Sequence, residues 1–184
     1  TEVRSTRREA NAASVANAEL AGTKEIRLDG TYKGHLQDVW WNGGTNLWWA
    51  HTSQILRTDT TGRILAKAEV EGHNAGCEVR DGKLFVAVCI MQNKTGGKTT
   101  SECRLQVNVH DAMSLKFLEE HVLDINDRAG SLAILPDGSF VVGCLRPPDI
   151  APTQVRLHHI SPDFKLISSY VIENVKVKLG IETI

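Results

Sequence analysis

The chain has 184 residues, of which 41% are hydrophobic and 23% are charged, and its net charge is −1. This near-neutral balance excludes a strongly basic nucleic-acid binder and an acidic disordered chain. No apolar run approaches the roughly 18–20 residues that a membrane span requires. We therefore expect a folded chain with a sizeable core, no nucleic-acid partner and no membrane span.

The N-terminal part of the chain differs from the rest in composition. Residues 1–22 are rich in Ala, Asn, Arg and Glu, and their few apolar residues form too sparse a stripe to dock a helix firmly. We expect a flexible or helical extension there. Residues 23–184 contain short strand-like segments and are expected to form a single domain. The chain begins with Thr1 rather than Met, so we expect that it was either processed, as an exported protein that has lost its signal peptide would be, or trimmed.

A unit of four short strands recurs three times after residue 30. The first turn of each unit combines Gly with Asn or Asp, and these turns fall at 42–43, 81–82 and 136–138. A second turn recurs at 61–62, 112–113 and 162–163. Glycine supplies a positive φ at such turns, and Asn or Asp tolerates it. The recurrence predicts three structural repeats.

Four-stranded repeats of about 40 residues are typical of β-propeller blades. The second strands, for example LFVAV at 84–88, are continuous apolar runs, as expected for strands buried on both faces. A β-sandwich is the alternative, but it would not require the same turn three times. We predict an all-β propeller domain over residues 23–184, with three full four-stranded blades, a stray outer strand at 23–30 and an inner strand at 178–184.

A closed propeller needs about 4–8 blades, so three full blades are too few to close the ring. We expect the chain to belong to a five- or six-bladed propeller. The other blades would lie in a longer polypeptide, or self-association would supply them from another copy. An open array of sheets is the third alternative.

The starts of the innermost strands line one mouth of the central channel in a propeller. The polar side chains expected to converge there are His35, Gln37, Asp38, His73, Asn74, Arg128 and Glu182. Histidine and carboxylate side chains suit zinc or manganese, whereas carboxylate and amide oxygens suit calcium. The same groups can act as general acids and bases, and an arginine can clamp an anion.

We therefore assign candidate roles to these seven residues. His35, His73 and Glu182 are candidate ligands of a divalent metal, and together with Arg128 they are candidate catalytic residues. Gln37, Asp38 and Asn74 are candidate ligand-binding residues. The alternative is that all seven only cap strand ends through hydrogen bonds. No glycine pattern for nucleotides and no GxSxG or HExxH motif is present, so no nucleotide cofactor is expected.

The four tryptophans and the four cysteines allow structural interpretations. All tryptophans lie between residues 40 and 49, and we expect core packing between blades rather than a sugar-stacking platform. Cys89 and Cys103 flank an inserted loop, and a disulfide there would contribute on the order of 3 kcal/mol, although free thiols remain the alternative. Cys77 and Cys144 are expected to be buried thiols. Four further histidines are expected to be exposed structural residues: His110, His121, His158 and His159.

The amino-acid sequence of the predicted blades resembles that of exported bacterial β-propeller proteins of largely unassigned function. The segments that carry this resemblance are GHLQDV, EGHNAG, DGKLFVAV, LPDGSFVVG and LGIET. More distantly, the pattern is similar to six-bladed calcium propellers of the gluconolactonase and strictosidine-synthase type. That resemblance implies a metal at the channel mouth, for which Glu182, Asn74 and Asp38 would supply oxygen ligands.

The sequence thus favours a secreted or periplasmic propeller that binds a small polar ligand, a carbohydrate or a lactone, at the channel mouth. Metal-assisted hydrolysis or lyase chemistry is the enzymatic form of this hypothesis. A non-catalytic scaffold for protein interactions is the alternative.

Overall fold

The structure is a computed structural model that describes residues 26–28, 32, 34–41, 43–91, 103–144, 149–151 and 154–173. The predicted extension at 1–22, the predicted inner strand at 178–184 and Glu182 lie outside these residues. Of the predicted outer strand at 23–30, residues 26–28 are described and are not in a strand. The carbonyl oxygen of Arg27 instead lies against Gly62, where an added Cβ would approach it to 2.1 Å.

The described chain forms three four-stranded antiparallel sheets, each built from consecutive strands. Blade 1 contains β1 (Leu36–Trp41), β2 (Asn46–His51), β3 (Gln54–Asp59) and β4 (Ile64–Glu69). Blade 2 contains β5 (His73–Arg80), β6 (Lys83–Met91), β7 (Cys103–Asp111) and β8 (Phe117–Val122). Blade 3 contains β9 (Ala129–Ile134), β10 (Phe140–Cys144), β11 (Val155–Ile160) and β12 (Leu166–Ile172).

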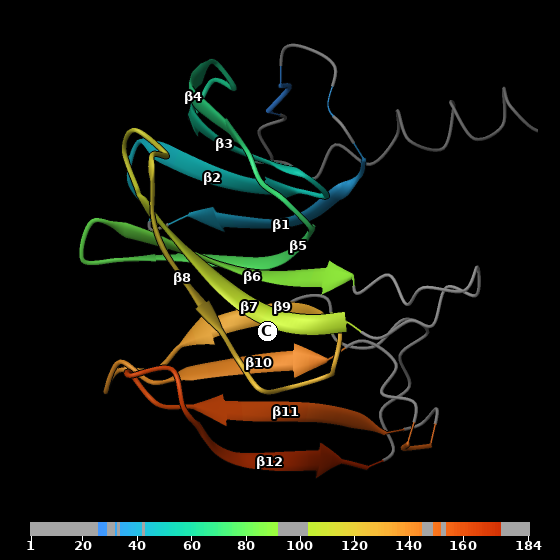
Figure 1. The fold of residues 1–184 in the computed structure, drawn as a ribbon. Coiled ribbons are helices and arrows are strands. Elements are labelled where there is room, and N and C mark those ends of the chain that lie inside the picture. Colours follow the sequence, from blue (N-terminus) through green and yellow to red (C-terminus); the bar gives the residue numbers. More distant parts are fainter. Residues whose placement is uncertain are drawn as a thin grey trace, which may run out of the picture.

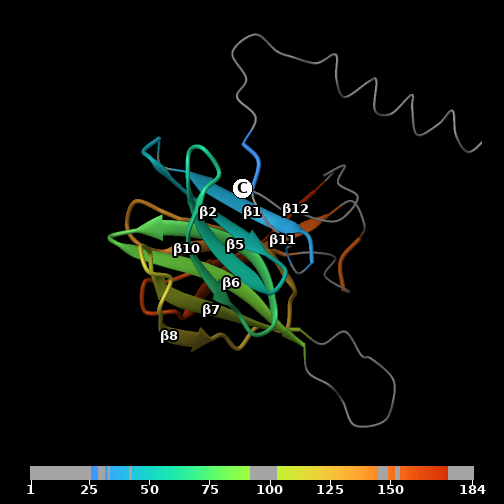
Figure 2. The ribbon, with the colours of Figure 1, turned by 90° about the horizontal axis from the view of Figure 1, so that it is seen from above.

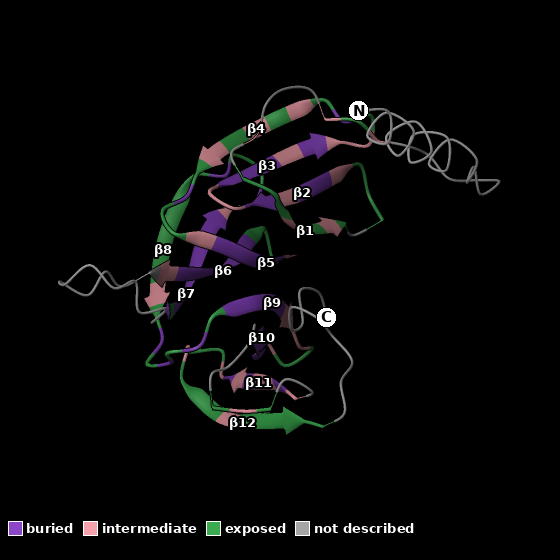
Figure 3. Cartoon of the chain, turned by 90° about the vertical axis from the view of Figure 1, so that its right-hand side faces the viewer, coloured by how far each residue is buried: buried purple, intermediate pink, exposed green. Residues whose placement is uncertain are grey.

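The three sheets are arranged as propeller blades, as predicted. Strand β5 contacts both β1 and β9, so the first strands of the three blades are neighbours (Figure 1). Strands β4 and β8 lie on the outer side of the resulting arc (Figure 3). Figure 2 shows the same sheets from above. The fold is therefore an all-β propeller arrangement, and the starts of β1, β5 and β9 meet at one end of it.

The recurring turns have the backbone conformation that their residues predict. Gly43, Gly82 and Gly138 all have φ between 75° and 87°, a region that glycine adopts without strain. The turn before the last strand of each blade also contains one residue of positive φ, and these residues are Gly62, Leu115 and Phe164. The matching geometry confirms that the three units are repeats of one another.

The hydrophobic core consists of two layers between neighbouring blades. Trp40 and Trp48 pack edge to face between blades 1 and 2, with ring centroids 5.4 Å apart. Phe85 and Phe140 pack between blades 2 and 3, at 5.4 Å. Gly76 allows close approach there, because a Cβ at this position would lie 2.1 Å from the backbone nitrogen of Leu132. Figure 3 shows the buried residues concentrated in the strands of these layers.

The predicted roles of the tryptophans, cysteines and histidines meet different outcomes. Trp40 and Trp48 pack in the core, whereas Trp41 is 57% exposed.

A disulfide joins Cys89 to Cys103, which settles the alternative left open by the sequence, and Cys77 and Cys144 are buried free thiols as expected. The prediction of exposed histidines is wrong for His110 and His158, which are 2% and 4% exposed because they face the layers between blades.

Candidate functional site

Four of the predicted site residues meet at the starts of the inner strands. The rings of His35 and His73 lie edge to face, with centroids 5.9 Å apart. The side-chain nitrogen of Gln37 lies 2.6 Å from Nε2 of His35, and Nη2 of Arg128 lies 3.2 Å from Nε2 of His73. The resulting row runs from blade 1 to the segment that leads into blade 3. We call Gln37, His35, His73 and Arg128 the mouth cluster.

Hydrogen-bond partners fix the protons on both imidazoles. Nδ1 of His73 lies 2.9 Å from the backbone oxygen of Asn74, which can only accept, so Nδ1 carries the proton. Nε2 of His73 therefore presents its lone pair to the guanidinium of Arg128. In the same way, the amide nitrogen of Gln37 donates to Nε2 of His35. Both rings are neutral in this arrangement.

The electrostatic environment keeps His73 uncharged. Burial lowers the pKa of His73, the hydrogen bond to the backbone oxygen of Asn74 offsets part of this, and the positive charge of Arg128 lowers the pKa further. Arg128 stays protonated under all ordinary conditions. The mouth cluster thus combines one permanent positive charge with two neutral imidazoles and one amide.

Two other predicted residues point into the contact between blades. The amide nitrogen of Asn74, a fully buried residue, donates to the backbone oxygens of His51 and Gln54, at 2.8 and 3.2 Å. The carboxylate of Asp38 accepts from the backbone nitrogen of Cys77 at 2.8 Å. These contacts hold blade 1 against blade 2.

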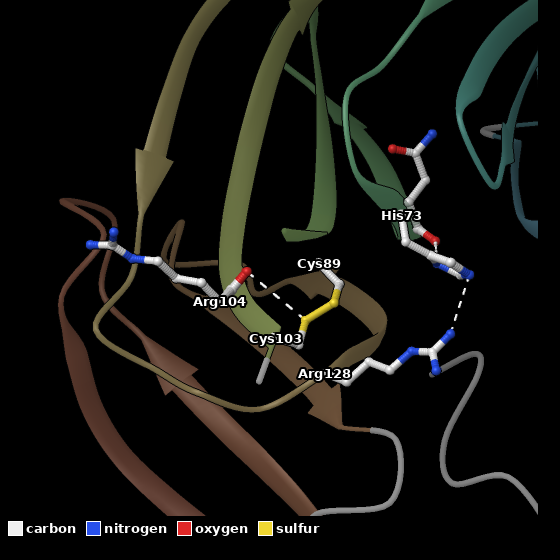
Figure 4. Close-up of a disulfide and its surroundings, with 6 residues drawn as sticks. His73, Cys89, Cys103, Arg104 and Arg128 are labelled. Atoms are coloured by element: carbon white, nitrogen blue, oxygen red, sulfur yellow. Dashed lines mark hydrogen bonds between the residues drawn. A yellow bond between two sulfur atoms is a disulfide. The ribbon is translucent and has the colours of Figure 1, made fainter. Parts of the chain in front are cut away.

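The disulfide lies beside the mouth cluster. Cys89 of β6 is the register partner of His73 of β5, so the disulfide to Cys103 braces the strand next to this histidine. Figure 4 shows the disulfide and the contact between His73 and Arg128 in one view, whereas the guanidinium of Arg104 points away from both. The end of β6 and the start of β7 therefore lie at the end of the blade where the mouth cluster lies.

The chemical capacity of the mouth cluster is to bind an anion or a hydroxylated group. Arg128 keeps N–H groups beyond the one that faces His73, and a guanidinium pairs well with a carboxylate. The expected metal has two neutral imidazole nitrogens available here, but each faces a donor, and the guanidinium beside His73 opposes a cation. Its predicted carboxylate ligand, Glu182, lies outside the described residues, so metal binding remains a prediction.

Sequence reasoning missed a second polar cluster, which lies in blade 3. One ligand atom each of Asp127, Cys144 and His158 lie within 4.8 Å of one another, and all three residues are buried. The carboxylate of Asp127 accepts from Nε2 of His158 at 2.8 Å and from Arg156 at 2.9 Å. Nδ1 of His158 then accepts from the hydroxyl of Ser169 at 2.8 Å.

These three bonds pair the polar groups around Asp127 and His158 with one another. Burial by itself would raise the pKa of Asp127, but the bonds from His158 and Arg156 outweigh it and hold the pKa below its usual range. Burial raises the pKa of the Cys144 thiol, so the thiol stays protonated. We interpret the cluster as a structural staple of blade 3. Its members share no motif spacing, so a single sequence carries no signal for it.

Comparisons with known proteins support the fold and no more. No protein-family model and no curated protein matches the sequence. Among solved structures, a protein of unknown function from Bacteroides caccae is similar, with 15% identity and a TM-score of 0.50 over 73% of this chain. A xylan β-1,4-xylosidase from Bacillus halodurans C-125 has 13% identity and a TM-score of 0.49 over 73% of this chain. The Dos1 propeller has 13% identity and a TM-score of 0.41 over 79% of this chain.

The chain spans only part of the length of these proteins. It covers 45% of the Bacteroides caccae protein, 31% of the xylosidase and 52% of the Dos1 propeller. Within the described residues, no helix is long and apolar enough to cross a membrane. These comparisons leave the ligand to be inferred from the site itself.

Proposed function

We propose that the mouth cluster binds a small polar ligand that carries a carboxylate, such as a sugar acid or the opened form of a lactone. The observation that carries this proposal is the contact of 3.2 Å between Arg128 and the neutral ring of His73. His73 holds the guanidinium in place without adding charge, so an anion can pair with its free N–H groups. His35 and Gln37 offer polar groups that suit sugar hydroxyls.

Titration calorimetry with glucuronate and glucose tests the proposal. Glucuronate is expected to bind and glucose to bind more weakly, because only glucuronate pairs with the guanidinium. Arg128→Gln is expected to weaken glucuronate binding about tenfold or more, since a charge-assisted hydrogen bond contributes about 1.5–3 kcal/mol. Arg104→Gln is the matched control, because Arg104 is exposed and points away from the site. Equal binding of both sugars, or equal loss in both variants, would contradict the proposal.

Catalysis belongs to the same proposal in a finer form. Metal-assisted hydrolysis or lyase chemistry would use His35 or His73 as metal ligand or base, with Arg128 on an anionic group of the substrate. A metal of calcium, zinc or manganese type would supply Lewis-acid activation. Metal analysis of the purified protein, compared with a variant that carries both His35→Ala and His73→Ala, tests this form.

The cellular compartment is likewise proposed to be oxidising, in a secreted or periplasmic setting. The disulfide between Cys89 and Cys103 supports this, because such bonds are rare in reducing compartments.

A scaffold for protein partners is the second candidate function. Apolar side chains on β8 and β12 support it, since Phe117 is 50% exposed and Ile167 and Tyr170 are 55% and 54% exposed. Partner binding that survives both Arg128→Gln and the double histidine variant would favour the scaffold.

A further inference from the structure

A groove with a different chemistry lies on the outer side of the contact between blades 1 and 2. It encloses about 380 Å³ between the end of β4 and strands β7 and β8. Figure 3 shows β4 and β8 on this side of the arc. The residues that line it are Glu69, Val70, Glu71, Ile90, Gln106, Asn108, His110, Phe117 and Glu120. None of them belongs to the mouth cluster.

The lining of the groove is acidic. Glu69, Glu71 and Glu120 contribute three carboxylates, and no lysine or arginine among the described residues lines the groove. Lys67 approaches Glu69 from outside, at 3.9 Å, and Gln106 donates to Glu120 at 3.2 Å. The groove therefore favours a positively charged occupant.

His110 supplies a second and independent observation. It lines the groove from β7, and alternation along the strand places it on the same face as Gln106 and Asn108, which also line the groove. Its Nδ1 lies 3.1 Å from the carbonyl oxygen of Leu115, so Nδ1 carries the proton and Nε2 carries a lone pair. Burial lowers the pKa of His110, which keeps the ring neutral.

This lone pair has no partner among the described residues. His110 is 2% exposed, and its Nε2 makes no hydrogen bond within the described part of the chain. A buried polar atom without a hydrogen bond lowers the stability of the fold by about 1–3 kcal/mol. A ligand that donates an N–H group would satisfy it.

The size and walls of the groove indicate an organic cation rather than a bare metal ion. Val70, Ile90 and Phe117 form apolar walls, and the volume exceeds what a single ion fills. Among the described residues, ligand atoms gather closely enough to hold a metal only at Asp127, Cys144 and His158. A hydrocarbon chain would contact the apolar walls, and the ring of Phe117 favours a nearby cation.

We propose that the groove between blades 1 and 2 binds a small alkylamine, whose ammonium group pairs with the glutamates and donates to Nε2 of His110. A diamine meets both requirements, because its two ammonium groups can reach different carboxylates along the groove. The affinity is expected to fall as ionic strength rises, because salt screens charges at partly exposed sites.

Titration calorimetry of the full chain with 1,5-diaminopentane tests this proposal, and 1,5-pentanediol is the neutral analogue. The diamine is expected to bind and the diol to give no measurable binding. Glu120→Gln is expected to weaken diamine binding about tenfold, through loss of one charge-assisted hydrogen bond. This variant keeps an acceptor for Gln106, so the fold should persist, and thermal denaturation checks that it does.

Glu119→Gln is the matched control, because Glu119 is a neighbour on β8 that pairs with Lys83 and does not line the groove. It is expected to leave diamine binding unchanged. No binding by the wild-type chain, equal binding of the diol, or an equal effect of Glu119→Gln would overturn the proposal. Arg128→Gln should leave diamine binding intact, which separates this test from that of the mouth cluster.

Discussion

Single carboxylates on the inner strands hold each blade to the next. Asp38 of β1 accepts from the backbone nitrogen of Cys77, and Glu78 of β5 accepts from that of Ile134 at 2.7 Å. Burial raises the pKa of both carboxyls, and these backbone bonds offset part of that rise. The same device therefore joins blade 1 to blade 2 and blade 2 to blade 3.

Asp127 anchors the staple of blade 3, and its charge is expected to stabilise the fold. Asp127→Asn removes the buried carboxylate that pairs with Arg156 at 2.9 Å and with His158 at 2.8 Å, whereas Asp149 remains as the second charged partner of Arg156. Breaking a buried pair costs about 3 kcal/mol or more, and the remaining pair with the exposed Asp149 keeps the expected cost at the lower figure. Urea denaturation at pH 7 should therefore show a free energy of unfolding lower by about this amount. Asp124→Asn, in the same loop but exposed, is the control and should change stability little.

The pH dependence of stability separates this effect from simple loss of packing. The folded-state pKa of Asp127 lies below the unfolded value of about 3.9, so its contribution is present above that value. The contribution is lost as pH falls through the folded pKa. The stability of the wild-type chain should thus fall more steeply below pH 4 than that of Asp127→Asn. Parallel curves for the two proteins would contradict the assignment.

Of the seven residues predicted to converge at the mouth, four do so in the structure, and the sequence could not predict how they bond. The recurring turns set the register of each blade, and this register brings His35, His73 and Arg128 to one end. The direction of each side chain depends on the neighbouring blade, however. Asn74 and Asp38 bond to backbone atoms across the contact between blades, and no local pattern in the sequence encodes such contacts.

At the scale of strands, the predicted units correspond to the observed blades because turn residues and apolar runs agree. Glycines mark the first turn of every blade, and the apolar second strands become β2, β6 and β10 at the middle of the sheets. The predicted strand at 23–30 lacked such a turn beside it, and its described part, residues 26–28, lies against Gly62 and is not in a strand. The glycine-containing turns were thus the feature of the sequence that predicted the strands of each blade reliably.

The disulfide across β6 and β7 is expected to stabilise blade 2. It closes a loop of about 15 residues, for which the loss of chain entropy in the unfolded state contributes about 3 kcal/mol. A variant with Cys89→Ser and Cys103→Ser should therefore lose about this much in urea denaturation. Reductant should lower the stability of the wild-type chain similarly and leave the double variant unchanged. A wild-type chain insensitive to reductant would contradict the prediction.

At the scale of the whole arc, side-chain donors from one blade reach turns of the next. The indole nitrogen of Trp48 donates to the carbonyl oxygen of Ala112 at 2.7 Å, and Arg57 donates to that of Met113 at 2.7 Å. Arg80 repeats this at the next contact, where it donates to Pro136 at 2.8 Å. Such bonds join residues 55–65 positions apart, so they make the blades unfold together rather than one by one.

Trp48→Phe is expected to weaken the coupling between blades 1 and 2. The substitution keeps an aromatic ring in the core but leaves the buried carbonyl of Ala112 without its donor, at a cost of about 1–3 kcal/mol. Amide hydrogen exchange should then show blade 1 opening at a lower free energy than blade 3, whereas the wild-type blades should open together. Trp41→Phe makes the same change at an exposed tryptophan and should leave the exchange pattern as it is. Uniform faster exchange in all three blades of Trp48→Phe would show instead that the blades remain one cooperative unit without this bond.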